Sequence, residues 1–457
     1  MIDTQLIRRT STGIFVSLAV ACAVPAQADT LEEALAKAYA TNPNLLAEQA
    51  KLRATDEGVS QALSGWRPTV TATGSAGYQK QVSDSSTPQT SYRDPRTAAL
   101  QVTQPLYRGG RTVSGTEQAE DNVLAERARL TNTEQTVLLN VVTAYMNLVQ
   151  AEAVLDLNRN NEQYLTRELQ ASRDRFNVGE LTRTDVAQSE ARLSGARSDR
   201  IQAEGDLASA RAVYQNVVGE APTKTTTPPD PAGTLPANLD DTIKAALGGN
   251  PNVVTADFSE RASRANIDVV RGALLPSLNL NGTAQREDDT LSTPDRWRDT
   301  YTVLLQLNIP IYEAGAIYSQ LRAAYETDRQ NQQLLDQARR DAQDTATRSW
   351  DAWQTARSRV NSLRSQVQAN QLALDGVRQE ALLGSRTVLD VLNAEQELLN
   401  SQVSLVRSEH DATIAAYQVR AAVGTLTAEA MSLPVALYDP KQNYRKVRDK
   451  WIGVGKE

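Results

Sequence analysis

Residues 31–44 read LEEALAKAYATNPN, and residues 239–252 repeat them as LDDTIKAALGGNPN, 208 positions later. Farther along the chain Gly179 recurs as Gly384, at an offset of 205, so the two copies differ in length by three residues. A unit of roughly 190 residues far exceeds the 20–50 residues of solenoid repeats. The sequence therefore indicates that a whole structural unit has been duplicated.

This duplication divides the chain into segments. The first repeat is predicted over residues 29–221 and the second over residues 239–425. A Thr- and Pro-rich linker, residues 222–238, separates them, and residues 426–457 form a tail that lacks the repeat pattern. Linker and tail have two interpretations, a belt packed around the helices near their middle, which we favour, or simple connecting segments.

Residues 1–28 have the pattern of a signal peptide. Two arginines precede an apolar run over residues 13–24, and small residues form a cleavage site ending at Ala28. The run is too short to span a membrane. Cys22 is the single cysteine and lies within it, so the mature chain is expected to carry no thiol. A lipoprotein start at Cys22 is the alternative, which Ala19 disfavours because leucine is usual at that position.

Composition argues against an enzyme. The 457 residues include one histidine, His410, so the side chains that bind zinc or copper are almost absent. No nucleophile and base stand out, and we expect neither catalysis nor a cofactor. The net charge of −7 gives no electrostatic reason to expect nucleic acid as a partner. Mean hydropathy is −0.45, and since no stretch approaches about 20 apolar residues, no membrane helix is predicted.

Long helices are predicted in both repeats. Between about Gly110 and Val178 there is no proline, and apolar residues recur at spacings of three and four. Such a helix would be about 100 Å long at 1.5 Å per residue. After Gly179, and again after Gly384, apolar residues follow a seven-residue rhythm, which predicts left-handed packing between neighbouring helices. Each repeat should therefore end in two antiparallel helices that meet at a glycine.

Two segments change to a period of two. The alternation predicts strand hairpins at about residues 69–106 and 277–311, with four strands of about ten residues, long enough to cross a bilayer when tilted. Polar tips are expected at residues 80–96 and 286–298. Prolines are expected at the joints between strands and helices, because proline ends a ladder or a helix. These joints are Pro68, Pro105, Pro276 and Pro310.

Alternation alone is equally typical of a soluble β-sandwich. Export and the two matched hairpins favour a membrane location instead. In lipid an open sheet edge leaves backbone groups unpaired, and four strands are too few to close a barrel. Several chains must then share one barrel. Two copies would give eight strands and a filled interior, whereas three would give twelve strands and a lumen, and we predict three.

Residues 384–394, GSRTVLDVLNA, together with the leader and the duplicated units, closely resemble the TolC-like outer membrane factor family. The resemblance implies a mainly α-helical chain with membrane β-strands. In a homotrimer, long coiled helices would form an α-barrel through the periplasm, joined to a shared twelve-stranded β-barrel in outer membrane lipid, four strands per chain. It further implies a passive exit duct for small molecules or for type I protein secretion. An inner membrane transporter, ABC-type or proton-driven, and a periplasmic adaptor would open it.

The resemblance also implies a gate at the periplasmic end. Residue-by-residue matching places a family aspartate at Asp390, while a second family aspartate is replaced by Asn393, so one carboxylate ring is expected. Arg386 matches an arginine that holds the closed state, and Asp185 matches its carboxylate partner. The turns led by Gly179 and Gly384 match the places where the family receives adaptor hairpins.

Departures from the family pattern leave alternatives open. Ala381 replaces a family tyrosine and Glu409 replaces an arginine, so the bonds of the closed state are expected to differ. Asp185 and Asp390 also fit a simpler role as carboxylates at helix starts. A rival class is an exported coiled-coil adaptor or structural rod, which explains the seven-residue rhythm but leaves four bilayer-length strands unexplained.

Overall fold

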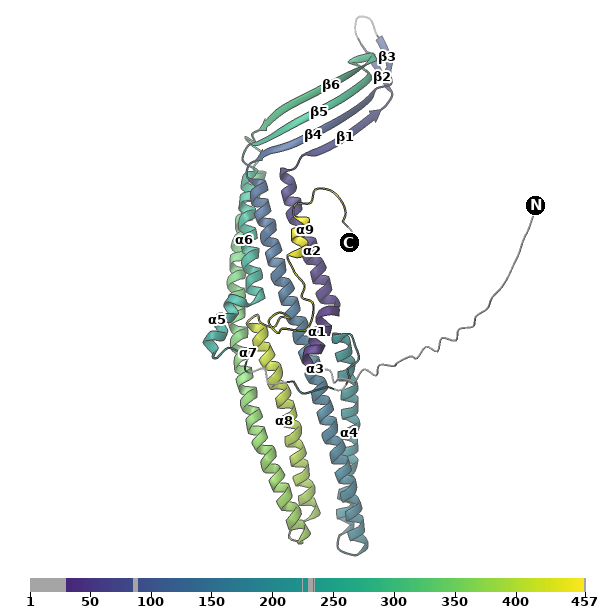
Figure 1. Ribbon diagram of the computed structural model, residues 1–457, viewed down its shortest axis with the longest axis vertical. Helices are drawn as coiled ribbons and strands as arrows, with labels where there is room; N and C mark the ends of the chain where they lie inside the picture. Colours follow the sequence, from purple (N-terminus) through teal and green to yellow (C-terminus); the bar gives the residue numbers. More distant parts are fainter. Residues whose placement is uncertain (1–29, 85–88, 224, 229–232, 234, 456–457) are drawn as a thin grey trace, which may run out of the picture.

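The computed structural model describes residues 30–84, 89–223, 225–228, 233 and 235–455. The predicted signal peptide with Cys22 lies outside these residues, as do parts of the first expected strand tip and of the linker. Figure 1 shows an elongated molecule in which long helices run side by side and a sheet extends from one end.

Helices make up most of the described chain. They are α1 (Leu31–Thr41), α2 (Pro43–Leu63), α3 (Arg111–Asn177), α4 (Arg183–Val218), α5 (Leu239–Gly249), α6 (Pro251–Gly272), α7 (Ala316–Leu382), α8 (Val388–Ala422) and α9 (Gln442–Val447), with a short 3₁₀ helix at Ser64–Trp66. The strands are β1 (Thr69–Ala76), β2 (Gln79–Ser83), β3 (Gln89–Arg93), β4 (Arg96–Arg108), β5 (Ser277–Thr290) and β6 (Thr293–Asn308).

Local sequence explains where the helices begin. Thr30 and Glu33 form a capping box at the start of α1, in which each side chain accepts a hydrogen bond from the other residue's backbone N–H. Asn42 caps α2, whose first residue is Pro43, and Asn250 caps α6 in the same way. The repeated Asn-Pro pair therefore breaks one helix and starts the next in both halves.

Two helices span most of the molecule's length. Helices α3 and α7 contain 67 residues each, which corresponds to about 100 Å at 1.5 Å per residue. The prediction of very long helices is confirmed. Helices α4 and α8 return antiparallel along them, so that both helix pairs turn at the end of the molecule opposite the sheet (Figure 1).

Strands from both repeats join in one antiparallel sheet with the order β1-β4-β5-β6. Within the sheet, the two repeats meet where β4 pairs with β5, from Arg96–Asp288 to Arg108–Ser277. Among the described residues β1 pairs only with β4, and β6 only with β5. The sheet therefore has two open edges, one from each repeat.

The strands differ from the sequence prediction in two respects. Residues 80–96 were expected to be a polar tip, but β2 and β3 form a separate two-stranded sheet within them, and β5 and β6 continue through most of residues 286–298. Polar residues form strands here because backbone pairing, rather than an apolar face, holds the hairpins.

Pro105 lies inside β4, three residues before its end, where the register with β5 shifts between Pro105 and Tyr107. Proline has no backbone N–H to donate to the neighbouring strand, and the shift in register allows Pro105 to lie within β4 without that hydrogen bond.

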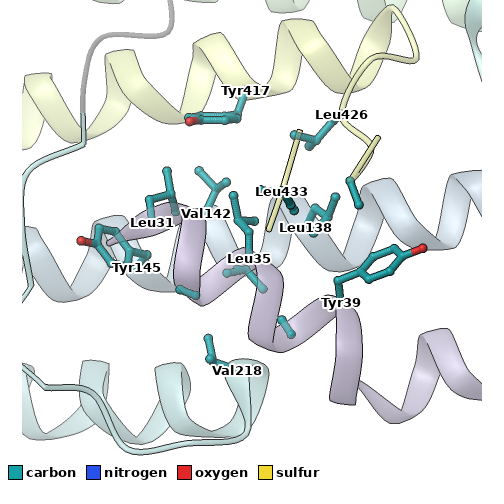
Figure 2. Packing of buried hydrophobic residues seen from close by; sticks show 14 of the residues in the cluster. Leu31, Leu35, Tyr39, Leu138, Val142, Tyr145, Val218, Tyr417, Leu426 and Leu433 are labelled. Carbon is teal, nitrogen blue, oxygen red and sulfur yellow. The ribbon is translucent and has the colours of Figure 1, made fainter. Parts of the chain in front are cut away.

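The largest apolar core lies near the middle of the helices. Figure 2 shows Leu35 of α1, Leu138 and Tyr145 of α3 and Tyr417 of α8 converging there, with Leu426 of the tail. Helix α3 is long enough to cross a membrane, and one 18-residue window within it is apolar enough to do so by composition. Of that window, 44% is buried. The expectation that no segment is so apolar was therefore wrong. Leu138 and Tyr145 are fully buried in this core, so the apolar character of α3 serves packing between helices.

The described parts of linker and tail pack against this core. Tyr145 Oη donates to Thr226 O over 2.6 Å, and Thr225 Oγ1 donates to Glu152 Oε2 over 2.5 Å. In the tail, Ala428 N donates to Glu134 Oε1 over 2.6 Å, and Tyr438 N donates to Tyr39 Oη over 3.2 Å. Both segments thus contact α3 at about half its length, and the tail also contacts α1.

Candidate functional site

The two helix turns opposite the sheet have the same backbone construction. Gly179 N donates to Phe176 O, and Glu180 N donates to Arg175 O. Gly384 and Ser385 make the equivalent bonds, so each turn closes its long helix with a Schellman motif. The φ angles are +82° at Gly179 and +80° at Gly384, a left-handed conformation that glycine adopts without strain. A Cβ atom at either position would meet no atom of the chain within 4 Å.

Each turn then starts its return helix with a capping box. Thr182 N donates to Asp185 Oδ2 over 2.9 Å, and Asp185 N donates to Thr182 Oγ1 over 3.3 Å. Thr387 and Asp390 repeat these bonds at 3.0 and 3.2 Å. The Thr182 hydroxyl and backbone lower the pKa of Asp185, and the Thr387 backbone and hydroxyl lower that of Asp390. Both aspartates are therefore ionised at neutral pH, and both have the helix-start role that the sequence left open.

Arg386 does not reach Asp185 within the chain. Its Nε donates to Glu380 Oε2 over 2.9 Å, across the turn, and both side chains are about half exposed. In the first repeat Arg175 and Glu180 form a similar pair at 3.1 Å, but with the arginine before the glycine instead of after it. The two turns thus carry the same ion pair in opposite order. Glu380 was missed from sequence because a partner six residues away across a turn has no periodic signal.

Asn393 joins the two repeats. Its Oδ1 accepts a hydrogen bond of 2.7 Å from Arg192 Nη2, which links α8 to α4. Beside this contact, Leu193 of α4 packs with Val388 and Leu392 of α8 in a buried cluster. Arg192 was not predicted, because it lies 201 residues from Asn393 and only the tertiary fold brings the two together.

A second link connects the helix pairs farther from the turns. Arg378 of α7 donates to Glu395 Oε2 of α8 over 2.8 Å, and its guanidinium lies 4.8 Å from the centre of the Tyr164 ring of α3. Burial raises the pKa of Glu395, although Arg378 opposes the effect. This cation–π and ion-pair arrangement, typical of arginine, ties three helices together.

The residues that depart from the family pattern have partners of their own. Ala381 packs against the small cluster of Leu374, Val391 and Leu398. Glu409 Oε1 accepts from Arg364 Nη2 over 2.8 Å. His410, the single histidine, lies with Nε2 2.8 Å from Asn147 Oδ1, and so connects α8 with α3.

The predicted proline joints lie at the other end of the helices. Pro68 directly precedes β1 and Pro276 directly precedes β5, whereas Pro310 follows the end of β6 by two residues. Three of the four prolines are thus outside the strands, and Pro105 is within β4. None of the four contacts the turn residues, since the long helices separate them (Figure 1).

Comparison with known proteins covers nearly the whole chain. A family model described as "Outer membrane efflux protein" matches residues 34–220 and 242–425. The outer membrane efflux protein BepC of Brucella suis is 35% identical over 97% of this chain and 96% of its own length. The outer membrane protein TolC of Escherichia coli is 24% identical over 90% and 86%, respectively. The solved structure of the Campylobacter jejuni CmeC outer membrane channel has a TM-score of 0.78 at 17% identity, and covers 92% of this chain and 89% of its own.

Proposed function

Because the chain belongs to the outer membrane efflux protein family, we propose that three copies assemble into one passive exit duct from the periplasm through the outer membrane. Members of this family are channels in the outer membrane that extend into the periplasm, and they serve efflux and type I secretion. The family does not support the rival reading of a periplasmic adaptor or rod. The chain's function is therefore transport.

One observation carries the proposed trimer: the sheet has open edges at β1 and β6 among the described residues. In lipid an unpaired edge costs several kcal/mol per backbone group, so the edges must pair with other chains. Four strands from each of three copies give twelve, which leaves a lumen, whereas eight strands would enclose only side chains. On β6, alternate residues Tyr301, Val303, Leu305 and Leu307 are 58–80% exposed, as a lipid-facing row would be.

The mass of the detergent-purified mature protein tests the assembly. We expect the mass of three chains, with migration on gels that changes on heating. Two lysine substitutions at neighbouring positions of β6 make the test more specific. Val303→Lys should prevent trimer assembly and reduce the amount of protein found in the membrane fraction, because lysine in the middle of a lipid-facing strand is unfavourable by roughly 2–4 kcal/mol. Thr302→Lys, whose side chain points to the other face, should be tolerated. A monomer that stays in solution without detergent would overturn the proposal.

We further propose that the helix turns form the periplasmic gate. Asp390 would supply one carboxylate ring, because three ionised side chains around an axis attract cations. Asn393, Arg386 and Asp185 would set how firmly the ends of the helices hold together. The Arg192–Asn393 bond supports this proposal because it links the two helix pairs, and the Arg386–Glu380 pair supports it because it lies at the α7–α8 turn.

The turns at Gly179 and Gly384 are the proposed docking places for a periplasmic adaptor, which would connect the duct with an inner membrane transporter of ABC or proton-driven type. The left-handed glycines and the open space around them support close approach by another backbone. At the opposite end, Pro68, Pro105, Pro276 and Pro310 would stiffen the transition from helices to strands.

A further inference from the structure

The last described residues of the tail are fixed beside the base of the sheet. Arg67 Nη1 donates to Lys450 O over 2.7 Å, and Ser60 Oγ donates to the same oxygen over 3.3 Å. The Arg67 guanidinium lies 5.2 Å from the centre of the Trp451 ring. Arg67 precedes the start of β1 by two residues, so this end of the tail is held where helices give way to strands (Figure 1).

Several specific contacts bring the tail to this place. Asn443 Nδ2 donates to Asp56 Oδ2 of α2 over 2.9 Å. Tyr444 Oη donates to Glu120 Oε1 of α3 over 3.0 Å, and Arg448 lies 3.5 Å from the same oxygen. Helix α9 is therefore bound along α2 and α3, and the residues after it have a defined position.

The residues after α9 expose large apolar side chains. Trp451 is 65% exposed, Ile452 90% and Val454 93%. Basic residues precede them in the sequence: Arg445, Lys446, Arg448 and Lys450. Tryptophan with aliphatic residues and flanking lysines or arginines is the combination found where proteins meet the membrane–water interface, since the rings enter the boundary and the cations face phosphate groups.

Other exposed aromatic residues occur at the same level of the molecule. Trp66 directly precedes Arg67, Tyr107 lies at the end of β4, and Tyr312 follows β6; they are 44%, 45% and 81% exposed. Membrane β-barrels carry such aromatic girdles at both interfaces. The contact between Arg67 and Trp451 therefore brings the exposed end of the tail to the junction of helices and strands, where these aromatic residues also lie.

We propose that residues 450–454 form an interfacial anchor that binds the leaflet of the outer membrane facing the periplasm. Trp451, Ile452 and Val454 enter the boundary between head groups and acyl chains, and Lys450 faces anionic phospholipid head groups. The contact with Arg67 holds the anchor beside the barrel. The inference rests on the proposed function, because it requires the sheet to lie in the membrane.

Depth-dependent fluorescence quenching tests the anchor. Three single-cysteine variants of the full mature trimer, Val454→Cys, Val303→Cys and Val178→Cys, carry the same fluorophore, and all three native side chains are at least 72% exposed. The trimer is reconstituted in vesicles of phosphatidylcholine with or without phosphatidylglycerol, and nitroxide-labelled lipids act as quenchers. Val303 reports on the sheet, and Val178, at the helix turn, reports on the aqueous end.

We expect severalfold stronger quenching at position 454 than at position 178, greatest with a shallow nitroxide and stronger with phosphatidylglycerol. Lys450→Gln should reduce the dependence on phosphatidylglycerol. Quenching at 303 without quenching at 454 would overturn the anchor and leave the duct intact. Quenching at neither position would overturn the membrane location of the sheet, and with it the proposed function. Protection of position 454 from both lipid and aqueous quenchers would mean that a neighbouring subunit covers it, and would also overturn the anchor.

Discussion

Arg192 of the first repeat donates a hydrogen bond of 2.7 Å to Asn393 of the second, and this contact ties the two helix pairs together close to their turns. A tunnel that opens at this end must separate or slide these pairs. The bond therefore favours the arrangement in which α4 and α8 lie side by side. Arg192 is cationic and its acceptor, the Asn393 side-chain oxygen, is neutral. Mutation can therefore strengthen the bond, by giving the acceptor a negative charge, or weaken it, by removing one partner.

Changing Asn393 should tune the gate. Asn393→Asp would convert the contact into a charge-assisted bond, which is roughly twice as strong, and should lower single-channel conductance in planar bilayers. Arg192→Ala removes about 1 kcal/mol per chain and should raise conductance. Arg183→Ala, an exposed arginine on the same helix, is the control and should leave conductance unchanged. Equal conductance in all three variants would exclude the α4–α8 bond from gating.

If Arg386 helps to hold the closed state, as proposed, then Arg386→Ser should also raise conductance. The structure separates two routes for this effect. If Arg386 acts through Glu380, to which it is bonded in the chain, then Glu380→Gln should reproduce the change. If it acts through Asp185 of a neighbouring subunit, then Asp185→Asn should do so instead. Unchanged conductance of Arg386→Ser in bilayer recordings would remove this residue from the gate.

Asp390→Asn should weaken block by multivalent cations added on the periplasmic side, because it would remove the proposed ring of negative charge. Asp185→Asn is the matched control, since it alters the equivalent capping box in the first repeat. The pKa of Asp390 is lowered by hydrogen bonds from Thr387, so the carboxylate stays charged, and its stabilisation is lost only as pH falls through the folded-state pKa below 3.8. Block should therefore be the same at pH 7 and pH 5. Equal block in Asp390→Asn and wild type would reduce this carboxylate to a helix cap.

Features that repeat along the chain were predictable from the sequence. The proline-free runs and their apolar spacing predicted helices that the structure contains as α3 and α7, and Gly179 and Gly384 predicted the turns between antiparallel helices. Helix ends and the apolar spacing of a helix depend on residues only a few positions apart, so they can be recognised directly in the sequence.

Features that depend on distant contacts were not predictable. A polar tip was expected at residues 80–96, yet backbone pairing makes β2 from residues 79–83 and β3 from residues 89–93. Pro105 lies within β4 because the adjoining β5 allows a shift in register, which no local rule anticipates. The partner of Asn393 comes from tertiary geometry, since it lies 201 residues away, whereas the partner of Arg386 is only six residues away but lies across a turn and has no periodic signal.

Substitutions of Gly384 can distinguish its role in forming the turn from its proposed role in adaptor docking. Valine at a left-handed φ of +80° should strain the turn by about 1–2 kcal/mol, whereas asparagine tolerates this conformation and still adds bulk. Gly384→Asn should therefore keep the helical circular dichroism and thermal stability of the wild type. If the turn docks an adaptor, it should also lose binding to adaptor hairpin peptides in titrations. Normal binding by Gly384→Asn would mean that docking tolerates a side chain at this turn.

Glu134 should make the docking of the tail depend on pH. Burial raises the pKa of Glu134, although the Ala428 N–H that donates to it opposes the shift. An acid with a raised pKa binds more protons folded than unfolded, so stability falls as pH rises from its ordinary value, near 4.5, through the folded-state pKa. Glu134→Gln keeps an acceptor for Ala428 N–H without the charge, and it should raise the melting temperature at pH 8 more than at pH 4. Glu397→Gln, which neutralises an exposed glutamate of α8, is the control and should have no such effect. A stabilisation by Glu134→Gln that is the same at both pH values would show that the buried carboxyl does not titrate against folding.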